Sequence, residues 1–438
     1  MIWLITARGP LRLSLRLTWD KRQLAGLFLA GVLLATVSAR GEEAAVEGRA
    51  EFQLFHNTME DIVARCIYRV SERDVLVGAL KALKQELGPK FTATLPSDLE
   101  RETAEDVWLV YQQALRSLAH SPEINRSLKS LVELSLRDYC RTLDRYSAYD
   151  DYDTWQKLQE FGEPDYTGVG VTVIEGREQD FVCDPIRGGP AERAGVDEGD
   201  RLIAMNERPV RGATGMQIRM WLGETGKDPV KLRVRHRDGK EQTVVVAKEQ
   251  IQSTPVSIEE GDSGVQIALR KITARGVTDF RNALRSVDPS KSITLDLRGC
   301  SGGTVPFAVA IASMFLPANT VVARLETLNG TETLLSTNSS PLKPAKMTIL
   351  QDRLTASGAE LIIAALRSYP PLKAESYGEK TYGKGVTQNV VKVSNRNAAK
   401  EEVVQAGILT ITDSRIYGPN GEVWDQEGLP PSRGDVRP

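Results

Sequence analysis

Histidine is scarce in this chain of 438 residues, which contains only His56, His120 and His236. All three histidines precede residue 250, so a Ser-His-Asp triad in the C-terminal half would need a histidine from a separate region of the fold. A hydrolytic site in that half is more simply built without histidine.

Cysteine is scarce as well. Four scattered cysteines are too few for a disulfide scaffold, and no Cys-x-x-Cys pair or histidine cluster indicates a metal site. We therefore expect neither a metal nor an organic cofactor. Two of the cysteines, Cys66 and Cys140, fall in helical stretches of one region, where they either pair after export or stay as buried free thiols.

An excess of charge is also absent, because the formal net charge is −2 and the 26% of charged residues carry both signs. Such a surface exerts no bulk attraction on nucleic acid or acidic lipid, so we do not expect a nucleic-acid partner.

The first 39 residues resemble an export signal. Basic residues up to Lys21-Arg22 precede an apolar stretch, Leu24–Ala35, and Val37-Ser-Ala39 offers small residues for cleavage. The apolar stretch is short for a membrane span. Residues 1–39 are thus either a cleaved signal peptide or a membrane anchor, and both predict a periplasmic or other extracytoplasmic location.

The rest of the chain is long enough for two or three domains. Residues 50–160 are mainly helical in pattern, with apolar residues three and four apart in the stretches 59–68, 75–83 and 128–136. We also expect any homo-oligomer to form through this N-terminal helical region.

Residues 166–248 change to short strands and glycine turns. The motifs Gly188-Gly-Pro-Ala-Glu-Arg-Ala-Gly195 and Gly199-Asp-Arg-Leu-Ile-Ala-Met-Asn206 closely resemble a PDZ domain. The resemblance implies that a free C-terminal tail adds as a strand, with its carboxylate on backbone N–H groups of Thr167, Gly168, Val169 and Gly170.

Residues 255–438 alternate helix and strand, which predicts an α/β core with helices on a partly parallel, mixed sheet. The helices are expected at 277–284, 306–315 and 361–366, the strands at 292–297, 346–350 and 386–393, and an exposed polar loop at 394–402. Functional sites collect at the carboxyl ends of such strands, where Gly302-Gly303 and Ser357 would both lie.

Ser357 precedes the apolar helical run Leu361–Leu366, so its hydroxyl would lie at a helix N-terminus that favours developing negative charge. A serine needs a base, and a lysine desolvated among glycine and apolar residues can serve. Lys384, in Thr381-Tyr-Gly-Lys-Gly385, is the candidate.

These residues resemble the C-terminal processing (tail-specific) serine peptidases. Thr355-Ala-Ser-Gly-Ala-Glu360 is similar to the family's nucleophile motif, Thr381–Gln388 to its Thr-Phe-Gly-Lys-Gly-x-x-Gln motif, and Leu295–Gly303 to its Asp-Leu-Arg-x-Asn-x-Gly-Gly turn. The resemblance extends over roughly residues 60 to 435, including a closing strand at Leu409–Gly421.

The chain departs from that family at several positions. Cys300 replaces an asparagine, Thr355 and Ala359 replace serines, and the spacing from Ser357 to Lys384 is about two residues longer around Pro370-Pro371. The segment Leu143-Asp-Arg-Tyr-Ser-Ala-Tyr149 has a tyrosine where the family has a histidine. The family's histidine is structural, so we expect little catalytic consequence.

Other interpretations of the same residues compete. Ser357 with Glu360 also forms a helix capping box. Gly378–Lys384 matches a phosphate-binding loop, but Gly385 lacks the hydroxyl that such a loop needs for magnesium, and a strand follows instead of a helix. Asp296 and Arg298 are expected to brace the turn as an ion pair. Cys300 is either a redox-sensitive thiol or, as we expect, a packed small residue.

The resemblance implies a Ser-Lys endopeptidase that selects protein or peptide substrates by their free C-terminal tails. Ser357 is the nucleophile and Lys384 the base, Gln388 orients the lysine amine, and the amide of Gly358 with Gly302 or Gly303 forms the oxyanion hole. The alternative is a PDZ scaffold on a degenerate peptidase fold that captures tails without cutting them.

Overall fold

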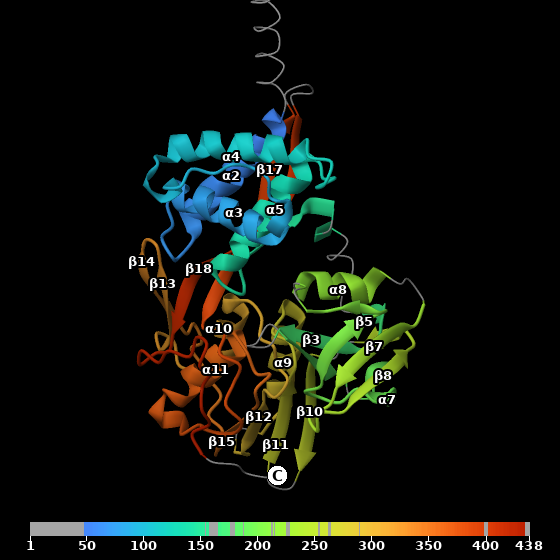
Figure 1. Ribbon diagram of the computed structural model, residues 1–438. Helices are drawn as coiled ribbons and strands as arrows, with labels where there is room; N and C mark the ends of the chain where they lie inside the picture. The colour runs from blue at the N-terminus through green and yellow to red at the C-terminus, as the bar shows by residue number, and fades with distance from the viewer. Residues whose placement is uncertain are drawn as a thin grey trace, which may run out of the picture.

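The computed structural model describes residues 48–153, 155–156, 165–175, 180–186, 188–211, 213, 215–224, 228–252, 255–261, 264–288, 290–397 and 402–433. The predicted signal or anchor, residues 1–39, lies outside them. No helix within these ranges is long and apolar enough to cross a membrane. Figure 1 shows a helical region at the top, a small sheet domain at the right and a larger core below.

The helical region forms because amphipathic helices bury their apolar faces against one another. Three of its helices begin at a hydroxyl residue, Ser71, Thr103 or Ser127, whose side chain accepts a backbone hydrogen bond. Cys66 and Cys140 are buried here as free thiols. The elements are α2 (Arg49–Arg65), α3 (Glu72–Leu87), η1 (Gly88–Lys90), η2 (Leu99–Arg101), α4 (Ala104–Ala119), α5 (Leu128–Leu143) and β1 (Ala148–Asp151).

A long antiparallel hairpin, β17 and β18, runs from the core into the helical region (Figure 1). Val393, Leu409 and Ile411 of this hairpin are buried in the core of the helical region, so the two parts share apolar packing. The sheet around the hairpin has the order β1-β18-β13-β14, with β17 beside β18. Its further strands are β13 (Val321–Thr327), β14 (Gly330–Leu335), β17 (Val386–Asn397) and β18 (Glu402–Tyr417).

The prediction of an exposed loop from Ser394 to Glu402 is wrong at both ends, since β17 continues to Asn397 and β18 begins at Glu402. Polar residues are compatible with these strands because an antiparallel ladder can keep one face in water. The Asn57 side chain of α2 also donates a hydrogen bond to the Ser394 carbonyl at 2.9 Å, which holds this part of β17 against the helical region.

Residues 165–252 form the small sheet domain. Antiparallel β2 and β9 pair where the chain enters and leaves it, and the main sheet has the order β3-β4-β5-β7-β8 with β6 beside β5. Within the described residues β3 is an edge strand, and α8 contacts it. The bounds are β2 (Asp165–Gly168), β3 (Val171–Glu175), β4 (Phe181–Pro185), α7 (Pro190–Arg193), β5 (Arg201–Met205), β6 (Arg208–Pro209), α8 (Gly215–Glu224), β7 (Val230–Arg235), β8 (Glu241–Val246) and β9 (Glu249–Gln252).

The C-terminal core confirms the predicted mixed sheet. Its order is β10-β11-β12-β15-β16, in which only the β10–β11 pair is antiparallel. The adjacent parallel strands β12 and β15 end side by side, so the turns that follow them meet at one edge. The elements are β10 (Val256–Gly261), β11 (Gly264–Leu269), α9 (Ala274–Ser286), β12 (Ile293–Asp296), α10 (Val305–Ser313), β15 (Met347–Gln351), α11 (Gly358–Arg367), η3 (Pro370–Leu372) and β16 (Glu375–Gly378).

Candidate active site

Ser357 is the N-cap residue of α11, at the end of the loop that leaves β15. Its backbone has φ 55° and ψ −120°, a conformation that costs a non-glycine residue on the order of 1–3 kcal/mol. The loop is held against the turn after β12, because the Ala356 N–H donates to the Cys300 carbonyl and the Thr355 hydroxyl donates to the Leu297 carbonyl, both at 2.9 Å. The serine therefore occupies a strained but well-supported position.

The turn after β12 is braced as predicted. Arg298 donates to both carboxylate oxygens of Asp296 at 2.9 and 3.0 Å, and Arg270 adds a third hydrogen bond at 3.0 Å. Burial acts to raise the pKa of Asp296, but the two guanidinium groups outweigh it and hold the pKa below its ordinary value. The Asp352 carboxylate, from the serine loop, accepts the Gly299 N–H at 2.9 Å and so joins the two turns.

The three glycines predicted for the oxyanion hole lie beside Ser357. A Cβ atom on Gly302, whose φ is 89°, would lie 2.8 Å from the Gly358 nitrogen and 2.9 Å from the Ser357 Cβ. A Cβ on Gly358 would lie 3.1 Å from the Gly303 carbonyl oxygen. Only glycine permits the approach at residue 302, and the role of these glycines as oxyanion donors stays a prediction.

A buried carboxylate connects the serine to the lysine. Glu360, in the first turn of α11, accepts the N–H groups of Ser357, Gly383 and Lys384 at 2.7, 2.7 and 2.8 Å, and the Thr381 hydroxyl at 2.6 Å. Burial raises the pKa of Glu360 to about 6, although these hydrogen bonds act to lower it. The sequence indicated Glu360 only as a capping partner, because a local pattern does not reveal contacts to a distant loop.

Lys384 lies in the loop before β17. Its carbonyl accepts the Trp424 indole N–H at 3.3 Å, and its Nζ lies 4.8 Å from the centre of the Tyr146 ring. Tyr146 is the residue that replaces the family's histidine, so the structure places this departure directly against the candidate base. Gln388 donates from Nε2 to the Thr412 hydroxyl at 3.4 Å, and its predicted role toward the lysine amine stays a prediction.

Glu360 does accept the Ser357 N–H as in a capping box, but the same carboxylate also holds the Lys384 loop. Gly385 leads into a strand, as expected, which does not fit a phosphate-binding loop. Cys300 is fully buried, and burial raises its pKa to about 12, which confirms a packed residue in place of a reactive thiol.

The segment predicted to hold a peptide carboxylate is part strand and part turn. Thr167 and Gly168 belong to β2, whereas Val169 and Gly170 form the turn that leads to the edge strand β3. Gly170 has φ 65°, and a Cβ there would lie 2.8 Å from the Pro190 Cδ of α7. The edge of β3 beside α8, which has no partner strand in the part of the chain that the structure describes, fits strand addition, while carboxylate binding stays a prediction.

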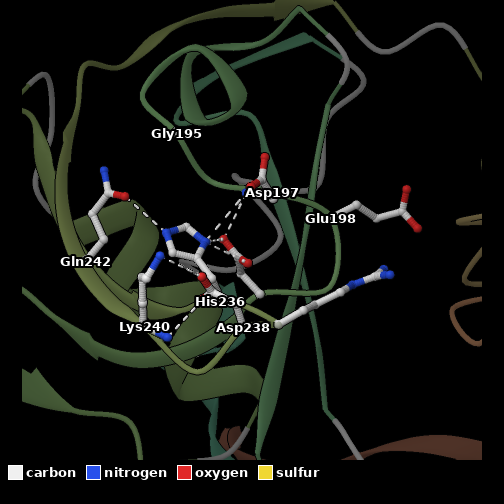
Figure 2. Close-up of a pocket in the computed structure, with 9 residues that line it drawn as sticks. Gly195, Asp197, Glu198, His236, Asp238, Lys240 and Gln242 are labelled. Carbon is white, nitrogen blue, oxygen red and sulfur yellow. Dashed lines mark hydrogen bonds and ion pairs between the residues drawn. The ribbon is translucent and has the colours of Figure 1, made fainter.

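A second polar cluster lies elsewhere in the same domain. Figure 2 shows the His236 ring pointing to Gln242 on one side and to the turn at 197–200 on the other. Nδ1 lies 3.0 Å from an Asp200 oxygen and Nε2 lies 3.0 Å from the Gln242 carbonyl oxygen. These two hydrogen bonds, that of Gln242 first, raise the pKa of His236. Asp197 is 3.9 Å away and exposed. Because both ring nitrogens have hydrogen-bond partners, we interpret the cluster as a structural contact within the small sheet domain.

Comparison with known proteins agrees with this arrangement. Residues 265–433 match the model of peptidase family S41, and residues 159–235 match the model of the PDZ domain. The chain therefore contains a PDZ domain followed by a peptidase family S41 domain, as its motifs predicted. The PDZ match ends before β8, although β8 pairs with β7 in the same sheet.

Two curated relatives are each a "Probable CtpA-like serine protease". The one from Staphylococcus aureus strain N315 is 30% identical over 292 residues, which cover 65% of this chain and 56% of the relative. The one from Staphylococcus haemolyticus is 27% identical over 293 residues, covering 66% and 56%. The chain thus spans about half the length of the curated relatives that it matches.

A solved structure shares the fold. The photosystem II D1 C-terminal processing protease matches with a TM-score of 0.60 at 18% identity, over 83% of this chain and 93% of that one. At this identity the match shows the overall fold alone, and not the role of any single residue.

Proposed function

We propose that this chain is a serine endopeptidase of the C-terminal processing type, which cleaves peptide bonds with a Ser357–Lys384 dyad. The shared carboxylate of Glu360 is the observation that carries the proposal. Since it binds the N–H groups of both residues, it holds the nucleophile loop and the base loop in one arrangement. A scaffold that only captured tails would have no physical need for this link.

In the proposed reaction the Ser357 hydroxyl attacks the substrate carbonyl while the neutral Lys384 amine takes its proton. The amine then returns the proton to the leaving amino group, and water hydrolyses the acyl-enzyme by the same steps. The amide of Gly358 and that of Gly302 or Gly303 stabilise the oxyanion, by about 3 kcal/mol per donor. Gln388 orients the amine from β17.

The PDZ domain supplies substrate selection in this proposal. A free C-terminal tail pairs with the open edge of β3 and places its carboxylate on the turn at Val169-Gly170. We further propose that the chain acts after export, as its N-terminal segment indicates, and that copies associate through the helical region. Cell fractionation and light scattering of the purified protein test these two points.

The deciding experiment incubates the full chain and its Ser357→Ala variant with an unfolded protein that ends in an apolar tail. A peptidase cleaves the protein only when Ser357 is present. If both proteins bind the tail and neither cleaves it, the scaffold alternative holds. If both cleave it equally, a different nucleophile acts.

A further inference from the structure

The segment after α5 packs directly on the loop that carries Lys384. The Arg145 guanidinium carbon lies 4.8 Å from the centre of the Tyr146 ring and 4.9 Å from that of Tyr382. The same side chain donates a hydrogen bond to the Gly383 carbonyl at 3.3 Å. Arg145 therefore links its own segment to both residues that immediately precede the candidate base.

The backbone of this segment is fixed as well. The Asp144 carboxylate accepts the N–H groups of Tyr146 and Ser147, both at 2.6 Å, and the Ser147 hydroxyl at 2.9 Å. The Ser147 oxygen in turn accepts the Thr412 N–H of β18 at 3.2 Å. These hydrogen bonds therefore connect the segment of Tyr146 to β18 and fix the position of the Tyr146 ring.

Two opposing effects act on the Lys384 amine at this place. The Tyr146 ring, with its centre 4.8 Å from Nζ, attracts an ammonium ion and favours the protonated lysine. Arg145 contacts the same ring, so the two cations lie within about 10 Å, a separation at which salt does not fully screen their repulsion. That repulsion favours the neutral amine.

Two carboxylates bind the backbone of the loop that carries the lysine. Glu360 of α11 binds the Lys384 N–H, and Asp425 accepts the Gly385 N–H at 3.0 Å. Burial raises the pKa of Tyr146 above its ordinary value, so the phenol stays neutral while the lysine titrates.

We propose that Tyr146 is a positioning residue for Lys384, and that the Tyr146 ring and the Arg145 charge together set the pH at which the amine becomes a base. The proposal rests on the Ser-Lys function proposed above. It gives this chain's replacement of histidine by tyrosine a role in catalysis, contrary to the expectation from the sequence. A neutral aromatic face does not change its charge over the working pH range, whereas an imidazole would.

The direct test measures the pKa of Lys384 by NMR, in full-length protein that carries 13C-labelled lysine and Ser357→Ala, with the signal assigned by its loss in Lys384→Ala. Tyr146→Leu should lower this pKa by about half to one and a half units, because the attraction for the ammonium is lost. Tyr146→Phe keeps the ring and should leave it unchanged. Arg145→Gln keeps a donor for Gly383 and should raise it.

A matched control is available in the same chain. The Lys392 Nζ lies 5.2 Å from the centre of the Trp155 ring, so Trp155→Leu removes a similar contact at a distance from the site and should not move the pKa of Lys384. Opposite shifts from Tyr146→Leu and Arg145→Gln would not arise from a general loosening of the fold. If both variants leave the pKa in place, the proposal is wrong. Should Tyr146→Leu fail to fold, Arg145→Gln alone decides.

Activity supplies an independent measurement. In the Ser357 protein, Tyr146→Leu should move the acid limb of the pH profile to lower pH and reduce kcat with little change in KM, and Tyr146→Phe should restore both. If Ser357→Ala still cleaves, the proposed function itself fails. If Ser357→Ala is inactive but Tyr146→Leu keeps the wild-type pH profile, only the role of Tyr146 fails.

Discussion

The two candidate sites of this chain are assembled in different ways. The peptide-binding site of the PDZ domain is local, since its turn and the edge strand β3 follow each other between residues 167 and 175. The peptidase site joins segments that are far apart in the sequence, which meet because β12 and β15 are adjacent and Glu360 binds two loops. Substitutions in the peptide-binding site should therefore weaken its function gradually. The residues of the peptidase site should instead act as one unit.

The largest expected effect tests whether the residues of the peptidase site act as one unit. Ser357→Ala and Lys384→Ala should each lower proteolysis by about 10⁴-fold or more, and the double variant should be no worse, because the two groups act together. The free energy of unfolding should fall by no more than about 1 kcal/mol, which is the cost of losing one helix cap. A double variant far worse than either single one would show that the residues act separately. Initial cleavage rates and calorimetry give both results.

A smaller effect is expected from the oxyanion turn. Gly302→Ala would place a Cβ 2.8 Å from the Gly358 nitrogen at φ 89°, so kcat should fall by about 10²-fold as one donor moves out of place. Gly421→Ala is the matched control, because Gly421 has φ 85° and no atom within 4 Å of such a Cβ. If kcat falls equally in the two variants, the cause is backbone strain and not the displaced oxyanion donor.

The burial of Glu360 predicts a pH-dependent stability. Its pKa in the folded protein is about 6, above the ordinary value of 4.5, so the folded state binds more protons between these values. The stability present below pH 4.5 should therefore decrease by about 2 kcal/mol as the pH rises through 6, and this decrease should disappear in Glu360→Gln. Urea unfolding at several pH values measures it.

Glu375 supplies a control of opposite sign. Hydrogen bonds from Tyr377 and then Arg433 hold the pKa of Glu375 below its ordinary value. Its contribution should therefore be present above the ordinary pKa and be lost as the pH falls. Should Glu360→Gln and Glu375→Gln change the pH dependence in the same direction, the assignment of a raised pKa to Glu360 would be wrong.

These contrasts also explain what could be predicted from the sequence. Local patterns predicted the main helices of the N-terminal region and the alternation of helix and strand that forms the mixed sheet, because periodicity is a local property. The PDZ and peptidase domains were predicted from motifs that resemble those of known families. The extension of β17 to Asn397 was missed because residues 394–397 are all polar and show no alternation of apolar and polar residues. The second role of Glu360 and the contact of Tyr146 with Lys384 depend on how distant segments meet, which no local pattern contains.

The smallest expected effect belongs to the local site. Amidating the C-terminus of a substrate removes the charge that the turn at Val169-Gly170 is proposed to bind, so binding should weaken by about tenfold. Cleavage at an internal bond should fall with it, although that bond is unchanged. In a scaffold, binding alone would change. Fluorescence anisotropy and cleavage rates with paired free and amidated substrates distinguish these cases.

Two glycine variants can assign this preference to the turn. Gly170→Ala would place a Cβ 2.8 Å from the Pro190 Cδ at φ 65°, so it should displace the turn and remove the difference between free and amidated tails. Gly188→Ala carries a similar strain, at φ 70°, but no atom lies within 4 Å of its Cβ, and the difference should persist. Because the peptidase site is built from other segments, Gly170→Ala should still cleave amidated substrates at the wild-type rate. If intact protein cuts free and amidated substrates equally, the PDZ domain does not select tails, and regulation or assembly becomes its role.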